Sequence, residues 1–485
     1  MFSKKRLIRG FYMLCVLGSP GCVLFPEVID SSIAIARPIE SLEQNQSQVK
    51  ETQNTPTSSY KAISLPLSND QNSDLPGKIP AFEGLPNLNV DDLIKEVLKR
   101  NPTLTAMTAA SEAAWAKYPQ AISLEDPNLG GWLAPATIGS NQVNVSMRVE
   151  YSQKLPGLGK RQLRGDIAQA QASATEKDIE VVKLQLVEDA RLAFYDFHLV
   201  DQAMEVNSDT LKLIEEFRQN AETRYKNGQA PQQDVLQAEV EIGLQKERSI
   251  ALKRMKKVAQ ARINTLLHLE PDLALPTPMK DMFLRMDKRN SEEMRNEARE
   301  NRPDLKSLED QIRADNSAVA LARKDFNPDY EAMAAYDSFW QGMDKQMQYQ
   351  IGLRMNLPSQ RSKRFAALSE AQAKLAQHKA DYQKLSDQIN FQVQEAYEQL
   401  LESNQILDLI NKTTLPAVRN NIKEAQSSYI TGKIPFLTLV TAQKELTLTR
   451  DRYYQIQTES FRRQAALDRA TGRLSVPEIN IKLKG

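Results

Sequence analysis

The chain has 485 residues, of which 41% are hydrophobic and 26% charged, and its formal net charge is +1. This charge balance lacks the basic excess of nucleic-acid-binding proteins, so we expect no nucleic-acid partner. The two cysteines, Cys15 and Cys22, both lie near the N-terminus, which excludes a disulfide framework in the rest of the chain. Long stretches rich in Ala, Gln, Glu, Lys and Leu favour long helices over compact globular domains.

Residues 1–36 have the pattern of an export signal and leader. Basic residues at positions 4–6 and 9 precede a short apolar run at 11–18, which is too short to span a bilayer as a helix. Two removal sites fit this segment: before Cys22, as in bacterial lipoproteins, where the cysteine is acylated, and after Ala36. Both sites stay open, and we expect lipidation of Cys22 only if the first is used.

Residues 37–88 are rich in Gln, Asn, Ser, Thr and Pro, so they predict a flexible polar lead-in that cannot bury enough apolar surface to order itself. After it, four prolines recur in the same order at offsets of 201, 201, 202 and 204 residues. Proline fixes φ and lacks a backbone donor, so it marks element boundaries. The recurrence predicts one structural unit used twice, at 89–270 and 291–474, with a connector at 271–290 and a tail at 475–485. The pairs are Pro102 and Pro303, Pro127 and Pro328, Pro156 and Pro358, and Pro231 and Pro435.

Each repeat is expected to open with a short amphipathic helix. Leu93 and Val97 have helical spacing in the first repeat, and Met294 and Ala298 take their places in the second. We expect the first helix to pass or bend at Pro102 and to continue towards residue 118.

A pair of strands follows in each repeat. Apolar and polar residues alternate over 143–152 and 347–356, which is the period of a strand, and weaker strands precede them near 129–133 and 330–338. The polar positions, which include Arg148, Glu150 and Arg354, then share one face. Trp132, Phe339 and Trp340 lie near the turns, where an aromatic girdle is expected.

Each strand pair leads into a very long helix. Residues 166–227 contain no Gly and no Pro, and these 62 residues predict a helix about 93 Å long. The second copy runs from 359 to 415, with a kink at Pro416 before it resumes to residue 431. The apolar stripe of the first helix has a heptad-like spacing and needs a neighbouring helix to cover it.

A tight reversal ends each long helix, at Tyr225-x-x-Gly228 and Tyr429-x-x-Gly432. Glycine suits the positive φ that ends a helix, and the proline three residues later suits the first turn of the next helix. The return helices, 231–267 and 435–471, are shorter than the outgoing ones, so the leading helix must supply the missing length. Each repeat therefore predicts two antiparallel columns, one continuous and one built from two pieces.

The fold that we predict is mainly α with a small β part. A four-stranded sheet has two free edges, and in a bilayer only a closed barrel satisfies every lipid-facing backbone group. Three chains would close it. The duplicated strand pair and long helical hairpin would then trimerise into a 12-stranded β-barrel, continuous with a 12-column α-helical barrel. In that arrangement Arg148, Glu150 and Arg354 would line the lumen of the β-barrel.

The doubled, proline-bounded joints between strand and helix and the doubled Tyr-x-x-Gly reversals resemble the outer-membrane efflux proteins, the TolC-like channel family. The resemblance covers residues 89–474. Residues 101–127 and the segment Leu-Pro-Gly-Leu-Gly-Lys-Arg at 155–161 are similar to its heavy-metal and cation efflux branch. The resemblance implies a homotrimer in the lipid of the bacterial outer membrane that extends into the periplasm. Its function would be that of a passive exit duct in a tripartite efflux system, coupled through a periplasmic adaptor to an inner-membrane transporter.

The resemblance also implies roles for residues at the hairpin tips. Six tip residues would contact the adaptor: Tyr225, Gly228, Pro231, Tyr429, Gly432 and Pro435. Better-known members narrow the tube with aspartate rings beyond the second reversal, where this chain has Thr438 and Thr441, so no acidic gate is expected there. The first hairpin has Asp234 and Gln237 at the equivalent places. Asp234 is either part of a cation-favouring constriction or a helix N-terminal residue stabilised by the dipole.

We expect no enzyme, no cofactor and no metal site. The three histidines share no motif with a second ligand, and Gly157-x-Gly159-Lys160 lacks the upstream glycine and the following Ser or Thr of a P-loop. Two other functions stay open: a type I secretion duct for polypeptides in the outer membrane, and a soluble periplasmic coiled-coil scaffold or adaptor. The exported substrate, whether metal, drug or polypeptide, is chosen by the partner pump.

Overall fold

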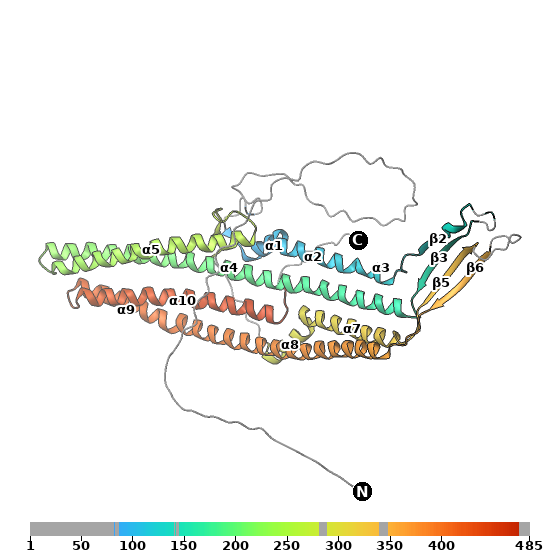
Figure 1. The fold of residues 1–485 in the computed structure, drawn as a ribbon. Helices are drawn as coiled ribbons and strands as arrows, with labels where there is room; N and C mark the ends of the chain where they lie inside the picture. Colours follow the sequence, from blue (N-terminus) through green and yellow to red (C-terminus); the bar gives the residue numbers. More distant parts are fainter. Residues whose placement is uncertain are drawn as a thin grey trace, which may run out of the picture. The chain divides into compact units, whose positions relative to one another are not determined.

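The computed structural model describes residues 82, 87–139, 141, 145–280, 289–338 and 348–474. The export signal with Cys22, most of the lead-in, Phe339, Trp340 and the tail lie outside the described residues. The chain divides into two units, Met1–Gln71 and Asn72–Gly485, and every described residue belongs to the second. This unit is mainly helical, with one small four-stranded sheet (Figure 1).

The first repeat opens with three helices, α1 (Val90–Arg100), α2 (Pro102–Trp115) and α3 (Lys117–Ile122). The leading helix does not pass through Pro102. Asn101 is extended, with φ −70° and ψ 118°, and its side chain accepts a hydrogen bond from the Thr103 N–H at 2.9 Å, which caps α2. Leu93 and Val97 are fully buried, as are their second-repeat counterparts, so the predicted apolar stripe is confirmed.

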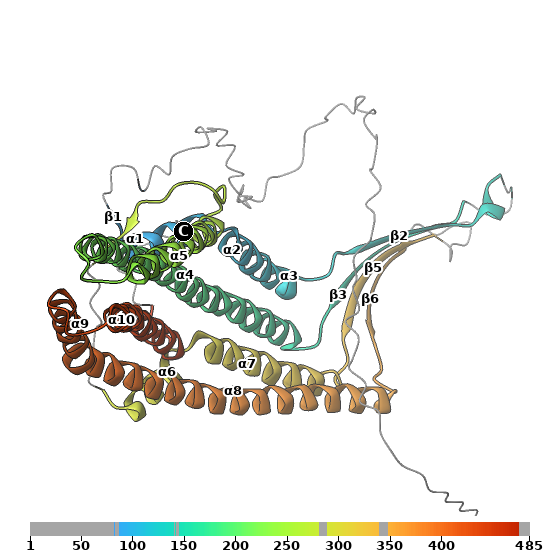
Figure 2. The same ribbon diagram turned by 90° about the vertical axis from the view of Figure 1, so that its left-hand side faces the viewer.

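The strands form one antiparallel sheet in the order β2-β3-β5-β6 (Figure 2). The members are β2 (Asn128–Leu133), β3 (Met147–Leu155), β5 (Tyr330–Asp337) and β6 (Gln348–Met355). All four predicted strands are present. The β3–β5 pairing joins the two repeats, and β2 and β6 form the two edges of the sheet, with no further strand paired to them among the described residues.

Helix α4 (Lys160–Lys226) has 67 residues and begins before the predicted start at Asp166. Gly165 therefore lies inside the helix, where the sequence predicts a boundary. A Cβ at this position would lie 2.5 Å from Cγ2 of Ile122, so the glycine lets α3 pack closely on α4. Close packing, and not helix termination, explains this residue.

The second long helix is interrupted as predicted. Helix α8 (Arg361–Leu409) passes into a π-helical turn, η2 (Ile410–Thr414), and then into α9 (Leu415–Ile430). Pro416 has no N–H to donate to the carbonyl four residues earlier. The wider turn directly before Pro416 accommodates the missing bond.

The return helices are α5 (Gln232–Leu266) and α10 (Phe436–Ala470), and the second leading pair is α6 (Ser291–Asn301) and α7 (Pro303–Lys324). In both repeats the leading segment meets the end of the return helix. Asn101 Nδ2 donates to the Leu266 carbonyl at 3.5 Å, and Arg302 Nη1 donates to the Arg469 carbonyl at 3.3 Å. The predicted two-piece columns are therefore confirmed.

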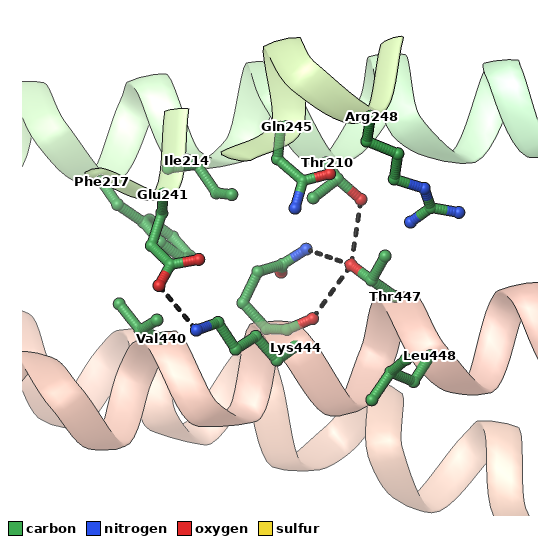
Figure 3. A pocket seen from close by; sticks show the side chains of 11 residues that line it. Thr210, Ile214, Phe217, Glu241, Gln245, Arg248, Val440, Lys444, Thr447 and Leu448 are labelled. Atoms are coloured by element: carbon green, nitrogen blue, oxygen red, sulfur yellow. Dashed lines mark hydrogen bonds and ion pairs between the residues drawn. The ribbon is translucent and has the colours of Figure 1, made fainter. Parts of the chain in front are cut away.

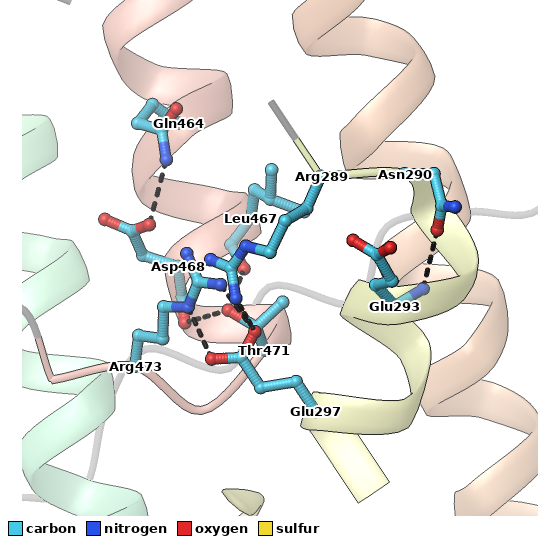
Figure 4. A network of polar contacts seen from close by, with 9 residues as sticks. All are labelled: Arg289, Asn290, Glu293, Glu297, Gln464, Leu467, Asp468, Thr471 and Arg473. Atoms are coloured by element: carbon cyan, nitrogen blue, oxygen red, sulfur yellow. Dashed lines mark hydrogen bonds and ion pairs between the residues drawn. The ribbon is translucent and has the colours of Figure 1, made fainter. Parts of the chain in front are cut away.

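Contacts between the repeats centre on α4, which packs against α5 in its own repeat and against α7 and α10 in the other. Arg191 of α4 and Asp468 of α10 form a buried ion pair at 2.8 Å. Near it, Arg289 and Arg473 both donate to Glu297 of α6, at 2.8 and 2.6 Å, which joins α6 to the segment that follows α10 (Figure 4).

Two short strands, β1 (Asn87–Leu88) and β4 (Thr277–Pro278), pair in parallel and fasten the end of the lead-in to the connector. None of the helices in the described ranges combines the length and the apolar character needed to cross a membrane.

Candidate functional site

One face of the sheet is almost wholly apolar and is exposed. The strand register places its residues on the same side, and Ile351 and Tyr349 are 94% and 82% exposed. No part of the described chain covers this surface, and a contiguous exposed apolar surface is typical of an interaction with membrane or protein. We call it the apolar sheet face: Leu129, Gly131, Leu133, Met147, Val149, Tyr151, Gln153, Leu155, Tyr330, Ala332, Ala334, Tyr336, Tyr349, Ile351, Leu353 and Met355.

The opposite face, which we call the polar sheet face, is mostly polar and carries Asn128, Gly130, Trp132, Arg148, Glu150, Ser152, Lys154, Glu331, Met333, Ala335, Gln350, Gly352 and Arg354. Arg148 pairs with Glu150 at 2.6 Å, and Arg354 pairs with Glu331 at 3.1 Å and with Glu150 at 3.9 Å. The three residues that we predicted to line a lumen therefore lie together on one face. Both signs of charge are present, so the face is polar without a large net charge.

Trp132 lies on the polar sheet face, opposite Arg148 in the register. The Arg148 guanidinium lies 5.7 Å from the centre of its ring. The expectation that Trp132 contributes to a girdle on the apolar side is therefore wrong, because strand parity places the side chain on the other face. Tyrosines supply the aromatic rings of the apolar sheet face, and Tyr336 and Tyr349 make an edge contact at 5.4 Å.

The hairpin tips have the turn geometry that the sequence predicts. Gly228 and Gly432 have φ angles of 67° and 74°, which non-glycine residues rarely adopt. Pro231 and Pro435 lie directly before α5 and α10, at the capping position and not in the first turn. Both glycines and both prolines are exposed or half-buried.

The two tip tyrosines differ sharply. Tyr429 is 3% exposed, and its hydroxyl donates to Asp234 Oδ2 at 3.0 Å, whereas Tyr225 is 44% exposed. The Tyr429 ring contacts Phe436 at 5.3 Å, and the Arg224 guanidinium lies 4.9 Å from its centre. Burial, and then the hydrogen bond to Asp234, raise the pKa of Tyr429.

Arg224 adds a second link between the hairpins, because its guanidinium donates to the carbonyls of Tyr429 and Ile430, the latter at 2.9 Å. We call Arg224, Asp234, Tyr429 and Phe436 the tip lock. It joins the first hairpin to the second. Sequence reasoning missed Arg224 and Phe436, although both lie within a few residues of a predicted reversal.

The four predicted constriction residues lie near the starts of the return helices, two on α5 and two on α10. Asp234 accepts the Tyr429 hydrogen bond and lies in the first turn of α5, where the helix dipole favours an acidic side chain. Thr438 and Thr441 are exposed, whereas Gln237 is half-buried.

Further along the hairpins, α4, α5 and α10 enclose a cavity of about 190 Å³ (Figure 3). Lys444 of α10 pairs with Glu241 of α5 at 2.6 Å across its mouth. At its floor the hydroxyls of Thr210 and Thr447 lie 3.0 Å apart. Polar contacts thus continue the connection between the two hairpins beyond the tip lock.

Nowhere in the ranges that the structure covers do three or more His, Cys, Asp or Glu side chains come together in a way that would hold a metal ion.

Comparisons with known proteins agree with this geometry. The chain is similar in structure to the outer-membrane channel OprN, at 19% identity and a TM-score of 0.64 over 82% of this chain and 97% of that one. It is also similar to CusC, which forms a transmembrane channel, at 17% identity and a TM-score of 0.68 over 80% and 92%. A third similar structure is the outer membrane protein VceC of Vibrio cholerae, at 18% and 0.66 over 79% and 96%. At these identities the likeness shows a shared fold.

No curated protein matches the sequence. The model of the outer membrane efflux protein family, however, matches residues 93–267 and 294–473, which lie inside the two predicted repeats. Because this match takes in most of the chain, the protein is an outer-membrane efflux channel and belongs to the outer membrane efflux protein family.

Proposed function

We propose that three copies of this chain associate around a threefold axis and form a passive exit duct that crosses the outer membrane and continues through the periplasm. Four strands from each chain would give a twelve-stranded barrel, in which β6 of one copy pairs with β2 of the next. The long helices would form a tube that continues the barrel. This tube would connect through a periplasmic adaptor to an inner-membrane pump that supplies the energy.

The observation that carries this proposal is the two-faced sheet with two free edges. An exposed edge whose flanking face is apolar cannot remain open in lipid, since each unsatisfied backbone group there costs several kcal/mol. Closure by further copies removes both edges at once. It also places the apolar sheet face against lipid and the polar sheet face, with Arg148, Glu150 and Arg354, in a water-filled lumen.

The hairpin tips support the coupling to an adaptor. Five of the six predicted contact residues are at least partly exposed, namely Tyr225, Gly228, Pro231, Gly432 and Pro435. Tyr429 is buried in the tip lock, so the geometry gives its side chain a role within the chain. A narrowing of the tube near Asp234 and Gln237 belongs to the same proposal. The pump, and not the duct, would select the cargo, be it a metal ion, a drug or a polypeptide.

Two neighbouring residues on opposite faces of β6 test the proposal. Ile351→Arg places a charge on the apolar sheet face, where it would meet lipid at a cost of about 2–4 kcal/mol per chain near the bilayer midplane. We expect a loss of at least tenfold in detergent-extractable trimer from the outer-membrane fraction. Gln350→Arg adds the same charge to the polar sheet face, and this matched variant should insert normally and conduct ions in planar bilayers.

Other outcomes would contradict the proposal. If both variants insert equally well, the apolar sheet face does not contact lipid and the polar sheet face does not line a lumen. If the wild-type chain is a monomer or dimer that remains soluble without detergent, the scaffold function replaces the duct.

A further inference from the structure

The two long helices that follow the sheet begin with clustered cations, although a helix N-terminus favours the opposite charge. Backbone N–H groups at a helix N-terminus favour acidic side chains. Acidic residues occupy the first turn of α1, α5, α6 and α7, and they are absent from the first turn of α2, α3, α4, α8, α9 and α10. What sets α4 and α8 apart is a cluster of cations: α4 begins with Lys160 and Arg161, and α8 begins with Arg361, Lys363 and Arg364. Both repeats have this cluster at the same joint.

Most of these cations have no carboxylate partner among the residues that the structure describes. Four exposed cations at the starts of α4 and α8 form no ion pair with any residue in the described part of the chain. We call them the basic collar: Arg161, Arg164, Arg361 and Lys363. Arg364 donates only to backbone carbonyls, those of Asp325 at 2.7 Å and Gln360 at 3.3 Å. Lys160 differs because it is buried and pairs with Asp325 and Asp329, at 3.3 and 2.8 Å.

Exposed leucines lie beside the basic collar. Leu158, two residues before α4, is 92% exposed, and Leu357, which continues the alternation of the apolar sheet face, is 77% exposed. Leu357 also borders a cavity of about 450 Å³, whose other walls include Asn356, Ser359, Lys363 and Arg364, together with the two aspartates that Lys160 binds. Apolar tips next to unpaired cations and helix N-termini suit a ligand that carries both an anion and an acyl chain.

We propose that the two strand-to-helix joints bind the phosphate groups of anionic phospholipids in the periplasm-facing leaflet of the outer membrane. The basic collar and the N-termini of α4 and α8 would contact the phosphate, and Leu158 and Leu357 would lie among the first methylenes of the acyl chains. This inference rests on the proposed function, because the joints lie at the membrane boundary only if the sheet forms a barrel. It explains why the same unfavourable charge pattern occurs twice, directly after the apolar sheet face.

The inference can be tested on the full-length protein in mixed detergent micelles. The thermal unfolding midpoint is measured with added phosphatidylglycerol and with added phosphatidylcholine. We expect phosphatidylglycerol to raise the thermal unfolding midpoint more than phosphatidylcholine, because a ligand that binds only the folded state stabilises it. Each Lys or Arg near an anionic surface strengthens binding about fivefold. A variant with Arg161→Gln, Arg164→Gln, Arg361→Gln and Lys363→Gln should therefore lose at least about a hundredfold in apparent affinity for phosphatidylglycerol.

The matched control removes four cations from α5, away from the sheet: Lys246→Gln, Lys253→Gln, Arg254→Gln and Lys257→Gln. It has the same net charge as the collar variant and should keep the response to phosphatidylglycerol. Inorganic phosphate, titrated over the same range, should not reproduce that response.

Four results would overturn the inference: equal midpoints in the two lipids, equal losses in both quadruple variants, an equal response to inorganic phosphate, or a collar variant whose trimer weakens to the same extent in either lipid. The last result would assign the charges to subunit contacts. Ion conductance of the same wild-type preparation separates the two proposals. A conducting trimer with no lipid preference refutes only the lipid site, whereas a soluble non-conducting protein refutes the duct.

Discussion

Tyr225 and Tyr429 occupy the same place in the two repeats but have different surroundings. Tyr429 owes its burial to residues of the other repeat, Arg224 and Asp234, whose counterparts 204 residues later are Ser428 and Thr438. The sequence motif predicts the turn correctly because a positive φ is a local requirement. It cannot distinguish the two tyrosines, since that difference depends on which hairpin lies alongside.

The tip lock predicts a specific loss of stability. Tyr429→Phe keeps the ring against Phe436 and Arg224 but removes the hydrogen bond to the Asp234 carboxylate. A hydrogen bond to a charged group contributes about 1.5–3 kcal/mol, so we expect a loss of that size in the free energy of unfolding, measured by denaturation in detergent. Tyr225→Phe is the matched control and should change stability by less than about 0.5 kcal/mol, as exposed substitutions usually do.

The pH dependence checks the same contact. Because the pKa of Tyr429 is raised in the folded chain, its contribution is fully present below about pH 10, the pKa of an unperturbed tyrosine, and is lost as the pH rises above that value. The wild type should therefore lose stability in this alkaline range more steeply than Tyr429→Phe. Parallel curves for the two proteins would show that the hydroxyl is not held by Asp234.

Among the elements, those with a strong period were predictable from sequence. The strand pairs follow from alternation, and the hairpins from the uninterrupted helical stretches between glycine and proline. The start of α4 could not be predicted from the sequence. A glycine within a helix costs about 1 kcal/mol relative to alanine, so Gly165 favours a helix boundary. Only the approach of Ile122 reveals why Gly165 is tolerated there. The π-helical form of η2 was likewise not predicted, because Pro416 indicates only that the helix is kinked.

Gly165 and Gly243 provide a contrast between two helical glycines. Gly165→Ala would place a Cβ 2.5 Å from the stiff side chain of Ile122, so we expect a loss of about 1–3 kcal/mol despite the better helix propensity of alanine. A Cβ added at Gly243 of α5 would meet no other atom within 4 Å, so Gly243→Ala should stabilise by up to about 1 kcal/mol. Circular dichroism during thermal unfolding measures both; a stabilising Gly165→Ala would contradict the close packing.

For the whole molecule, duplication predicts two copies of one unit, and the structure joins them into a single sheet through β3 and β5. The sequence indicates this common sheet only indirectly, because strand order depends on contacts between residues far apart in the chain. The polar sheet face was easier to predict, since Arg148, Glu150 and Arg354 occupy alternate positions of strands whose period is clear.

The proposed lumen predicts a change in ion selectivity. Arg354 is 62% exposed at its side chain and would be repeated in each copy of a trimer. Arg354→Gln would remove one positive charge per chain from the polar sheet face, which should shift the reversal potential in a KCl gradient towards cation selectivity. Arg354→Lys preserves the charge and should leave the reversal potential unchanged. The same shift in both variants would argue against an electrostatic role of Arg354 in the lumen.

Both composite columns are divided at the same level, where Asn101 meets Leu266 and Arg302 meets Arg469. The two long helices are therefore the more continuous connections between the sheet end and the tip end. The first of them, α4, is unbroken over 67 residues, or about 100 Å. The second is interrupted by the π-helical turn η2. We therefore expect a force applied at the tips to be transmitted mainly along α4, and any bending to concentrate at η2, so that the first repeat would be the stiffer of the two.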